Sequence, residues 1–137
     1  SAVYVKDGVF DRGEGLEGAE GNQAIAAMTQ SPGHQKAIQS GLTHFTGLPY
    51  IELDGGAAAV TSYLQILHPD AQAPDRELSN HGTTQGFRIH RVVANRWSLV
   101  RTPQGWKVKN RKLRQMDGSE PAREILRQAL ASYRPAE

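Results

Sequence analysis

The stretch LTHFTGLPYIELDGGAAAVTSYLQILHP, residues 42–69, decides the fold of this chain of 137 residues. Residues 42–53 and 57–68 are two runs rich in β-branched, aromatic and aliphatic side chains. Between them stand Asp54, Gly55 and Gly56, and glycine supplies the positive φ angles that tight turns require. The pattern therefore predicts a β-hairpin.

The register of this hairpin decides which side chains share a face. A three-residue loop at 55–57 pairs Asp54 with the residue that follows the loop and puts His44 directly opposite His68. The same face then carries Tyr50, Val60, Ser62, Leu64 and Ile66. A bulge at Pro49, which cannot donate to the ladder, shifts the register by one and reverses this arrangement.

The remaining sequence predicts further strands and a few short helices. A strand at residues 2–10 precedes a glycine-rich acidic loop and two short helical pieces, one capped by Asn22 and one at 34–40. A loop leads to a long strand at 87–100, which turns at 102–105 into a returning strand at 106–116. After the cap residue Ser119 a helix repeats apolar residues at helical spacing: Ala122, Ile125, Leu126, Ala129, Leu130 and Tyr133. The predicted fold class is α+β, a curved antiparallel sheet with helices packed against it, in one domain over 1–137.

Composition narrows the possible functions. The chain has 38% hydrophobic and 22% charged residues and a net charge of +2, which is typical of a globular protein and too weak to predict a nucleic-acid or membrane partner. No cysteine is present, so disulfides and thiolate chemistry are excluded. No apolar run approaches the roughly 20 residues that a membrane-spanning helix needs, and a cytoplasmic location is the expectation.

The long strand adds a buried amide to the two histidines. Strand alternation places Asn95 on the more apolar face of this strand, which it shares with Phe87, Ile89, Arg91, Val93, Trp97 and Leu99. An unpaired buried amide costs on the order of 1–3 kcal/mol, so Asn95 needs a partner in the protein or in a ligand. Trp97 and Trp106 are expected in the core or in a pocket wall, and the other three histidines at the surface.

These segments resemble a known family. THFTGLPYIELDGGAAAVTSYLQILHP and RVVANRWSLVRTPQGWKV are similar to the SnoaL-like branch of the nuclear transport factor two-like superfamily, and within it to scytalone dehydratase. The resemblance implies a cone-shaped α+β barrel around an apolar pocket, commonly in a homodimer, that takes a small apolar ligand. It also implies that the two catalytic histidines and the asparagine of scytalone dehydratase fall on His44, His68 and Asn95, and that a pocket tyrosine falls near Tyr4. The family begins with two helices that carry an aspartate and a tyrosine, and this sequence is expected to start after them.

The predicted chemistry is acid/base catalysis without a cofactor. Elimination of water from a β-hydroxy carbonyl compound needs a base, an acid and a donor for the enolate oxygen. Histidine, with an ordinary pKa near 6.5, serves as acid or base at neutral pH. We therefore expect His44 and His68 to be catalytic and Asn95 to orient the substrate. The further substrate-binding candidates are Tyr4, Tyr50, Trp97 and Arg111.

Three other interpretations stay open at the level of sequence. Two histidines can bind zinc, but no third ligand stands at motif spacing, and no metal site is expected. The fold also serves in non-catalytic ligand-binding or assembly modules, such as the small subunit of ring-hydroxylating oxygenases. The basic run 107–114 favours a nucleic-acid surface only weakly, because no aromatic residues alternate with the charges; Arg111 or Arg114 can instead point inward to a substrate carboxylate.

Overall fold

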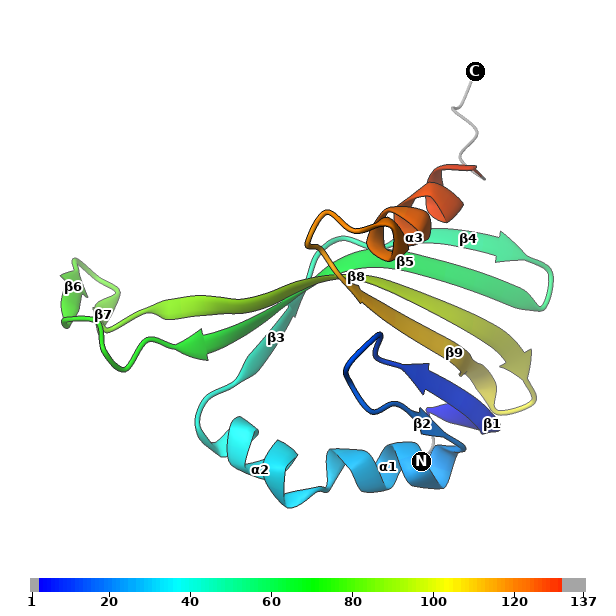
Figure 1. Cartoon of the computed structure of the whole chain (residues 1–137), viewed down its shortest axis with the longest axis horizontal. Helices are drawn as coiled ribbons and strands as arrows, with labels where there is room; N and C mark the ends of the chain where they lie inside the picture. Colours follow the sequence, from blue (N-terminus) through cyan, green and yellow to red (C-terminus); the bar gives the residue numbers. More distant parts are fainter. Residues whose placement is uncertain (1–2, 132–137) are drawn as a thin grey trace.

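The computed structural model describes residues 3–131, and its centre is one large twisted sheet. The strands lie in the order β2-β1-β9-β8-β5-β3, and β4 pairs with β5 along the same edge as β3. Their bounds are β1 Tyr4–Asp11, β2 Ala19–Glu20, β3 Thr43–Thr46, β4 Tyr50–Asp54, β5 Ala57–Pro69, β8 Phe87–Thr102 and β9 Gly105–Gln115. Figure 1 shows the sheet between the helices α1 and α2 on one side and α3 on the other. The α+β fold class predicted from the sequence is confirmed.

The predicted hairpin is present, but its register differs from the prediction. Asp54 pairs with Ala57, so the turn contains only Gly55 and Gly56, and Gly55 has a φ of 54°. The first predicted strand is also split into β3 and β4, because the chain leaves the ladder at 47–49, where proline has no N–H to donate. In β3, His44 pairs with Ile66 and not with His68.

The two faces of the sheet follow from these pairings. The inner face, which we define by Ser62, Leu64, Val93, Asn95 and Arg111, faces α2. The outer face carries Thr61, Ala94 and Arg96 and is contacted by α3. The predicted face of the long strand is wrong at its start: Ile89 pairs with Leu67 while Arg91 pairs with Ile66, so a bulge at position 90 turns Phe87 and Ile89 away from Val93.

The sheet is mixed and not closed. β1 runs parallel to β9, whereas the prediction was a fully antiparallel sheet, and β2 and β3 form its two ends without pairing to each other. Between Tyr4 and Val9 the register jumps, because Tyr4 pairs with Val108 and Val9 already with Asn110. This irregularity lets β1 bend over the end of β9.

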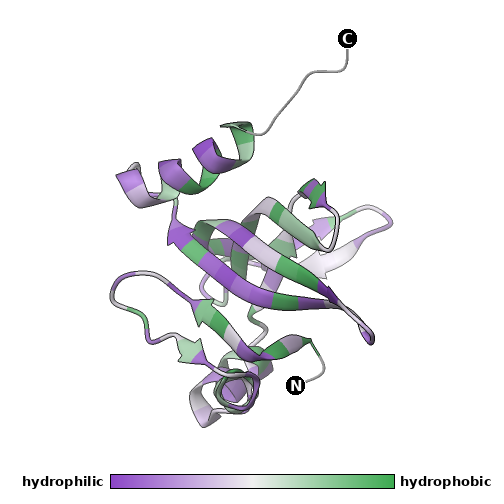
Figure 2. Ribbon diagram, turned by 90° about the vertical axis from the view of Figure 1, so that its right-hand side faces the viewer, coloured by the Kyte–Doolittle hydropathy of each residue, from purple (hydrophilic) through white to green (hydrophobic). Residues whose placement is uncertain are grey.

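Small apolar clusters hold the helices and strands together. Leu64, Val93 and Leu113 form a buried cluster on the inner face, against which Phe10 packs. On the outer face Ala94 packs with Ala122 and Ile125 of α3 (Glu120–Ala131), as the helical spacing predicted; Tyr133 lies outside the described residues. Figure 2 shows the apolar stripe of α3 and the alternation of polar and apolar residues along the strands.

The two short helices were also predicted, with one difference. Helix α1 (Asn22–Thr29) has Gly21 as its N-cap, with φ 84° and no side-chain cap, so the predicted capping by Asn22 is wrong. Helix α2 (Pro32–Gln39) is capped by Ser31, whose hydroxyl accepts a hydrogen bond from the backbone N–H of His34. That cap fixes the start of the helix that carries His34 over the inner face.

A hairpin that the sequence did not predict projects from the far end of β5 and β8. β6 (Arg76–Leu78) and β7 (Gly82–Thr84) pair with each other around Asn80, which has a φ of 63° (Figure 1). Among the helices of residues 3–131, none has the length and hydropathy to cross a bilayer.

Candidate functional site

A buried hydrogen-bond chain crosses the inner face. Asn95, in the middle of β8, is fully buried (0% exposed), and its Nδ2 donates to Ser62 Oγ on β5 at 3.1 Å. Its Oδ1 accepts from Nε of Arg111 on β9 at 3.1 Å. Both ends of the amide are therefore satisfied within the protein, which fixes its orientation and makes it a support for Arg111.

Arg111 is held by aromatic side chains as well as by hydrogen bonds. Its guanidinium carbon lies 4.2 Å from the ring centre of Trp97 and 4.9 Å from that of Phe10. A further hydrogen bond joins it to the hydroxyl of Tyr4. Burial lowers the pKa of Arg111 from its usual value, although Tyr4 opposes the shift. The side chain is thus a positively charged group in an apolar, aromatic setting.

Tyr4 keeps its proton at neutral pH. Burial raises the pKa of its phenol, and this effect outweighs the opposite influence of the Arg111 charge and hydrogen bond. The phenol oxygen accepts from Arg111, so its own O–H stays available as a donor. A donor of this kind suits an oxygen atom that gains negative charge during a reaction.

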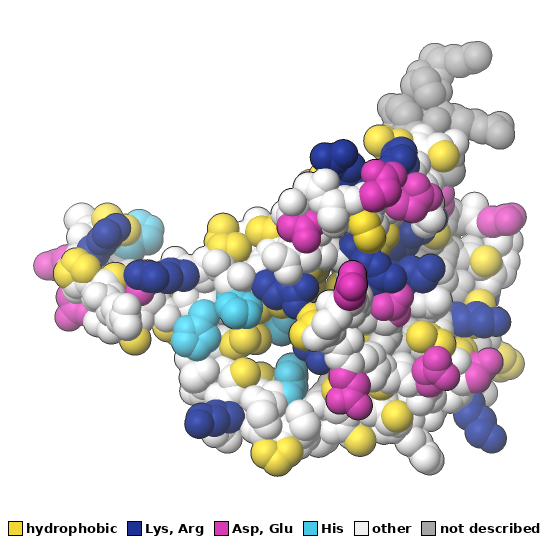
Figure 3. All heavy atoms as spheres, viewed as in Figure 1, with side chains coloured by type: hydrophobic (Ala, Val, Ile, Leu, Met, Phe, Trp, Pro, Cys, Tyr) yellow, Lys and Arg dark blue, Asp and Glu magenta, His cyan; other side chains and the backbone are white. Residues whose placement is uncertain are grey.

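His44 lies at the edge strand β3 on the same side of the sheet. Partial burial of the imidazole lowers its pKa below 6.5, and the positive charges of Arg111 and of His34 act in the same direction. His44 is therefore neutral at pH 7 and able to accept a proton. The residue as a whole remains exposed, so solvent reaches it. Figure 3 shows histidine side chains around the hollow between the helical segment and the sheet.

His68 has a different environment from His44. Its Nδ1 is 3.0 Å from the backbone oxygen of Pro69, which can only accept, so Nδ1 carries a proton. Its Nε2 is 3.2 Å from Oγ of Ser40, the residue that caps the end of α2. Both ring nitrogens are therefore engaged: Nε2 joins the end of α2 to the end of β5, and Nδ1 bonds to the next residue of β5.

Comparison with known proteins places this architecture in a family. The family model of the SnoaL-like domain matches residues 1–112. The chain belongs to the SnoaL-like family. An NTF2-like protein with a cystatin-like fold from Novosphingobium aromaticivorans is 30% identical in sequence, with a TM-score of 0.75 over 90% of this chain and 71% of that one.

More distant structures share the fold of this SnoaL-like domain. A candidate scytalone dehydratase from Novosphingobium aromaticivorans is 21% identical, with a TM-score of 0.59 over 84% of this chain and 67% of that one. ActVI-ORFA from Streptomyces coelicolor is 20% identical, with a TM-score of 0.56 over 86% of this chain and 80% of that one. None of the curated proteins matches this sequence.

Not every residue predicted for the site of this SnoaL-like domain lies on the inner face. Tyr50 pairs with Thr61, which puts it on the outer face and corrects the predicted register by one residue. There it lines a groove of about 350 Å³ with Leu126 and Leu130 of α3. Trp106 is 40% exposed, so it is not a core residue. Tyr4, Asn95, Trp97 and Arg111 do come together, and His44 is near enough for the charge of Arg111 to lower its pKa.

Two members of the site were not expected from the sequence. His34 was placed at the surface, but it is partly buried and acts electrostatically on His44. Phe10 was assigned only to a strand, but its ring packs against Arg111. The position of Phe10 beside Arg111 would have followed from the sequence if the parallel pairing of β1 with β9 had been known, because Phe10 pairs with Arg111 in that ladder.

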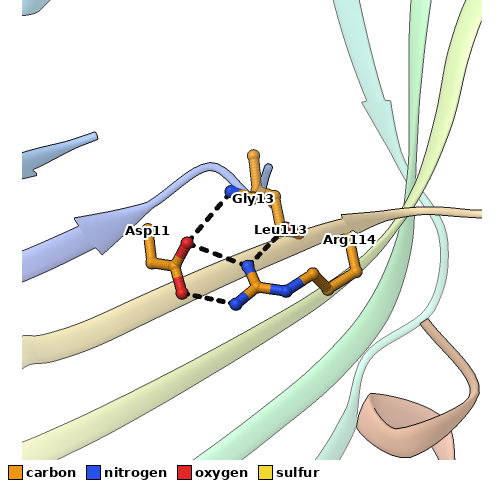
Figure 4. Close-up of polar contacts among 4 residues, drawn as sticks. All are labelled: Asp11, Gly13, Leu113 and Arg114. Atoms are coloured by element: carbon orange, nitrogen blue, oxygen red, sulfur yellow. Dashed lines mark hydrogen bonds and ion pairs between the residues drawn. The ribbon is translucent and has the colours of Figure 1, made fainter. Parts of the chain in front are cut away.

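A charged cleft of this SnoaL-like domain, separate from the inner face, lies at the end of β9. It has a volume of about 280 Å³ and is lined by Arg12, Arg91 and Arg114, among others. Arg114 is bound there by both carboxylate oxygens of Asp11, at 2.9 and 2.6 Å (Figure 4). Within residues 3–131, no three histidine or carboxylate side chains gather as metal ligands.

Proposed function

We propose that this protein is a cofactor-independent lyase or isomerase that performs acid/base chemistry on a small, largely apolar oxygenated molecule. The observation that carries the proposal is a pair of groups that both interact with the charge of Arg111: the histidine His44, which is neutral at pH 7, and the protonated phenol Tyr4, which is hydrogen-bonded to that cation. Membership of the SnoaL-like family supports an apolar ligand on the inner face. A homodimer and a cytoplasmic location stay predictions.

The reaction we propose begins at a carbon next to a carbonyl group. His44 accepts the proton of that carbon, and the carbonyl oxygen gains charge against the O–H of Tyr4. The protonated His44 then delivers the same proton to a departing hydroxyl, which leaves as water, or to another carbon in an isomerisation. Either outcome returns the enzyme to its starting state without an outside proton or electron.

The other residues act by position in this proposal. Arg111 polarises Tyr4 and is itself oriented by Asn95 and Ser62. Trp97 and Phe10 offer aromatic surface to the substrate. His68, predicted from the sequence as catalytic, instead has a positioning role here, because its two ring nitrogens bind Ser40 and the Pro69 carbonyl.

A probe that reports only on base strength tests the proposal before the substrate is known. The compound 5-nitrobenzisoxazole loses its ring C–H proton to a base, its N–O bond breaks, and a coloured phenolate appears. We expect His44→Gln to slow this reaction by about 100-fold, the effect of losing a positioned general base. The rate should fall only below pH 6.5, because the pKa of His44 is lowered.

The matched control is His81→Gln, the same change at an exposed histidine in the projecting hairpin. It should leave the rate unchanged. Equal rates for the parent protein and His44→Gln would refute the base, and would leave a ligand-binding module as the function to pursue.

A further inference from the structure

Arg111 is a cation for which the described residues supply no carboxylate. The ion pairs of residues 3–131 join Arg88, Arg96, Arg114 and Arg127 to acidic partners, and Arg111 has none. Its hydrogen bonds go to the neutral groups of Asn95 and Tyr4, and its guanidinium carbon lies near two aromatic rings. Each of these neighbours fixes the position of the charge, and none neutralises it.

A desolvated charge without a counter-ion is costly, so its retention points to a partner that arrives from outside. Arg96 on the neighbouring strand β8 is a useful contrast. It lies on the outer face and has Glu52 at 3.0 Å. Within residues 3–131, Arg96 on the outer face thus has an acidic partner and Arg111 on the inner face has none.

The donor geometry of Arg111 selects the kind of anion. A guanidinium has five N–H groups, of which Asn95 occupies the one on Nε and Tyr4 accepts another. The others lie in the same plane as a fork, which matches the two oxygens of a carboxylate. The surrounding inner face is apolar, with Phe10 and Trp97 against the cation and Leu64, Val93 and Leu113 beyond.

We propose that Arg111 binds a carboxylate of the substrate, and therefore that the substrate is a small aromatic or apolar carboxylic acid. The inference rests on the proposed function in so far as the same inner face is the active site. The acid group anchors one end of the molecule on Arg111, and the reacting carbon then lies within reach of Tyr4 and His44. Asn95 is a positioning residue, since it holds the guanidinium through Nε.

The test compares two ligands that differ only in charge, 3-phenylpropionate and its primary amide. Binding is followed by the fluorescence of Trp97 in a Trp106→Phe variant, because Trp97 touches Arg111 and Trp106 lies at the surface. We expect the acid to bind about tenfold more tightly than the amide, as a charge-assisted pair should. Arg111→Gln should remove this difference, and Arg111→Lys, which keeps the charge but lacks the fork, should retain part of it.

Two further variants sharpen the result. Asn95→Asp places a carboxylate where the amide oxygen now lies, 3.1 Å from Nε of Arg111, and should also abolish the preference for the acid. Lys109→Gln removes one positive charge from an exposed position of the same strand and should not affect it. Circular dichroism checks that each variant folds.

Equal affinities for the acid and the amide in the protein with Arg111 intact overturn the proposal, and so does a failure of the acid to bind. This comparison needs no substitution at Arg111, so its result does not depend on whether the Arg111 variants fold. The outcome is separate from that of the proposed function, because 5-nitrobenzisoxazole has no carboxylate. Loss of proton abstraction in His44→Gln with equal binding of acid and amide keeps the base and refutes only the anion site.

Discussion

At the scale of single residues, the inner face is built around one buried amide. Asn95 bridges β5 and β9 by accepting from Arg111 and donating to Ser62, so three neighbouring strands are joined by side chains as well as by their ladders. Hydrogen bonds in such a buried chain are worth little net, but leaving a member unpaired is expensive. The amide therefore serves stability and the orientation of Arg111 together.

Asn95→Leu should expose this double role. The leucine keeps the branch at Cγ and the number of side-chain heavy atoms, but its methyl groups are bulkier than the amide and leave Arg111 Nε and the Ser62 hydroxyl without partners. We expect the free energy of unfolding to fall by about 2 kcal/mol or more, measured by urea denaturation. Ser98→Ala, at an exposed position of the same strand, should change it by less than about 0.5 kcal/mol. A fully stable Asn95→Leu protein would mean that the hydrogen-bond chain adds nothing to the fold.

The sequence predicted part of this residue-level picture. The inward position of Asn95 followed from strand alternation, and the need for a partner followed from its burial. The pairing of His44 with His68 did not hold, because the turn has two residues instead of three and because the chain leaves the ladder around Pro49, which shifts β3 by one residue more. His34 was missed because its electrostatic effect on His44 depends on how α2 lies relative to the sheet, which local sequence does not encode.

At the scale of elements, the irregular strand β1 is what brings Tyr4 to Arg111. Four residues of β1, positions 5–8, stand opposite the single residue Lys109 of β9. Gly8 closes this bulge and is buried, and a Cβ at this position would lie only 2.9 Å from Cδ1 of Tyr4. The phenol can therefore occupy its place only because position 8 has no side chain.

Gly8→Ala should consequently be much worse than an ordinary glycine replacement. We expect a loss of about 1–3 kcal/mol in the free energy of unfolding, since the new methyl group displaces the Tyr4 ring. Gly33→Ala is the matched comparison, because that position lies in α2 and has no atom within 4 Å of the added Cβ. It should stabilise the protein or leave it unchanged. Equal effects at the two positions would contradict this account of the bulge.

Elements with a local signal were predicted and those with a distant partner were not. The Gly55–Gly56 turn and the apolar stripe of α3 depend only on residues that are close in the sequence, and both are present. The parallel pairing of β1 with β9 joins segments far apart in the chain, and the bulge at position 90 has no local signature. The small β6–β7 hairpin was read as a loop because its strands are only three residues each.

At the scale of the whole molecule, an ion pair joins two neighbouring strands that lie far apart in the sequence, β1 and β9. Asp11 and Arg114 are 103 residues apart in sequence and form two hydrogen bonds beside the β1–β9 ladder (Figure 4). Arg114, and next the backbone N–H of Gly13, lower the pKa of Asp11 against the effect of its partial burial. The pair thus favours the ionised carboxylate in the folded state.

The sign of the resulting pH dependence can be stated. A carboxylate whose folded pKa is lowered contributes stability above its unfolded pKa of 3.8, and this contribution disappears as the pH falls through the lower folded value. Asp11→Asn should therefore lower the thermal midpoint at neutral pH and make it less sensitive to acid than that of the parent protein, measured between about pH 2 and pH 7. Parallel curves for the two proteins would show that the ion pair does not couple to folding. Lys109→Gln, at an exposed position of β9 that does not act on the pKa of Asp11, is the control.

The parallel pairing of β1 with β9 has a consequence for the newly made chain. A ribosome releases the amino-terminal end first, and β5 and β8 can form their ladder as soon as residue 102 has emerged. The main partner of β1 is β9, which is complete only after residue 112 has been synthesised. Until then the valines of β1, Tyr4 and Phe10 remain exposed to water, although nearly all of the sheet has been synthesised. During that interval β1 can pair only with the two residues of β2 and is accessible to chaperones, and the aromatic groups around Arg111 come together late in synthesis.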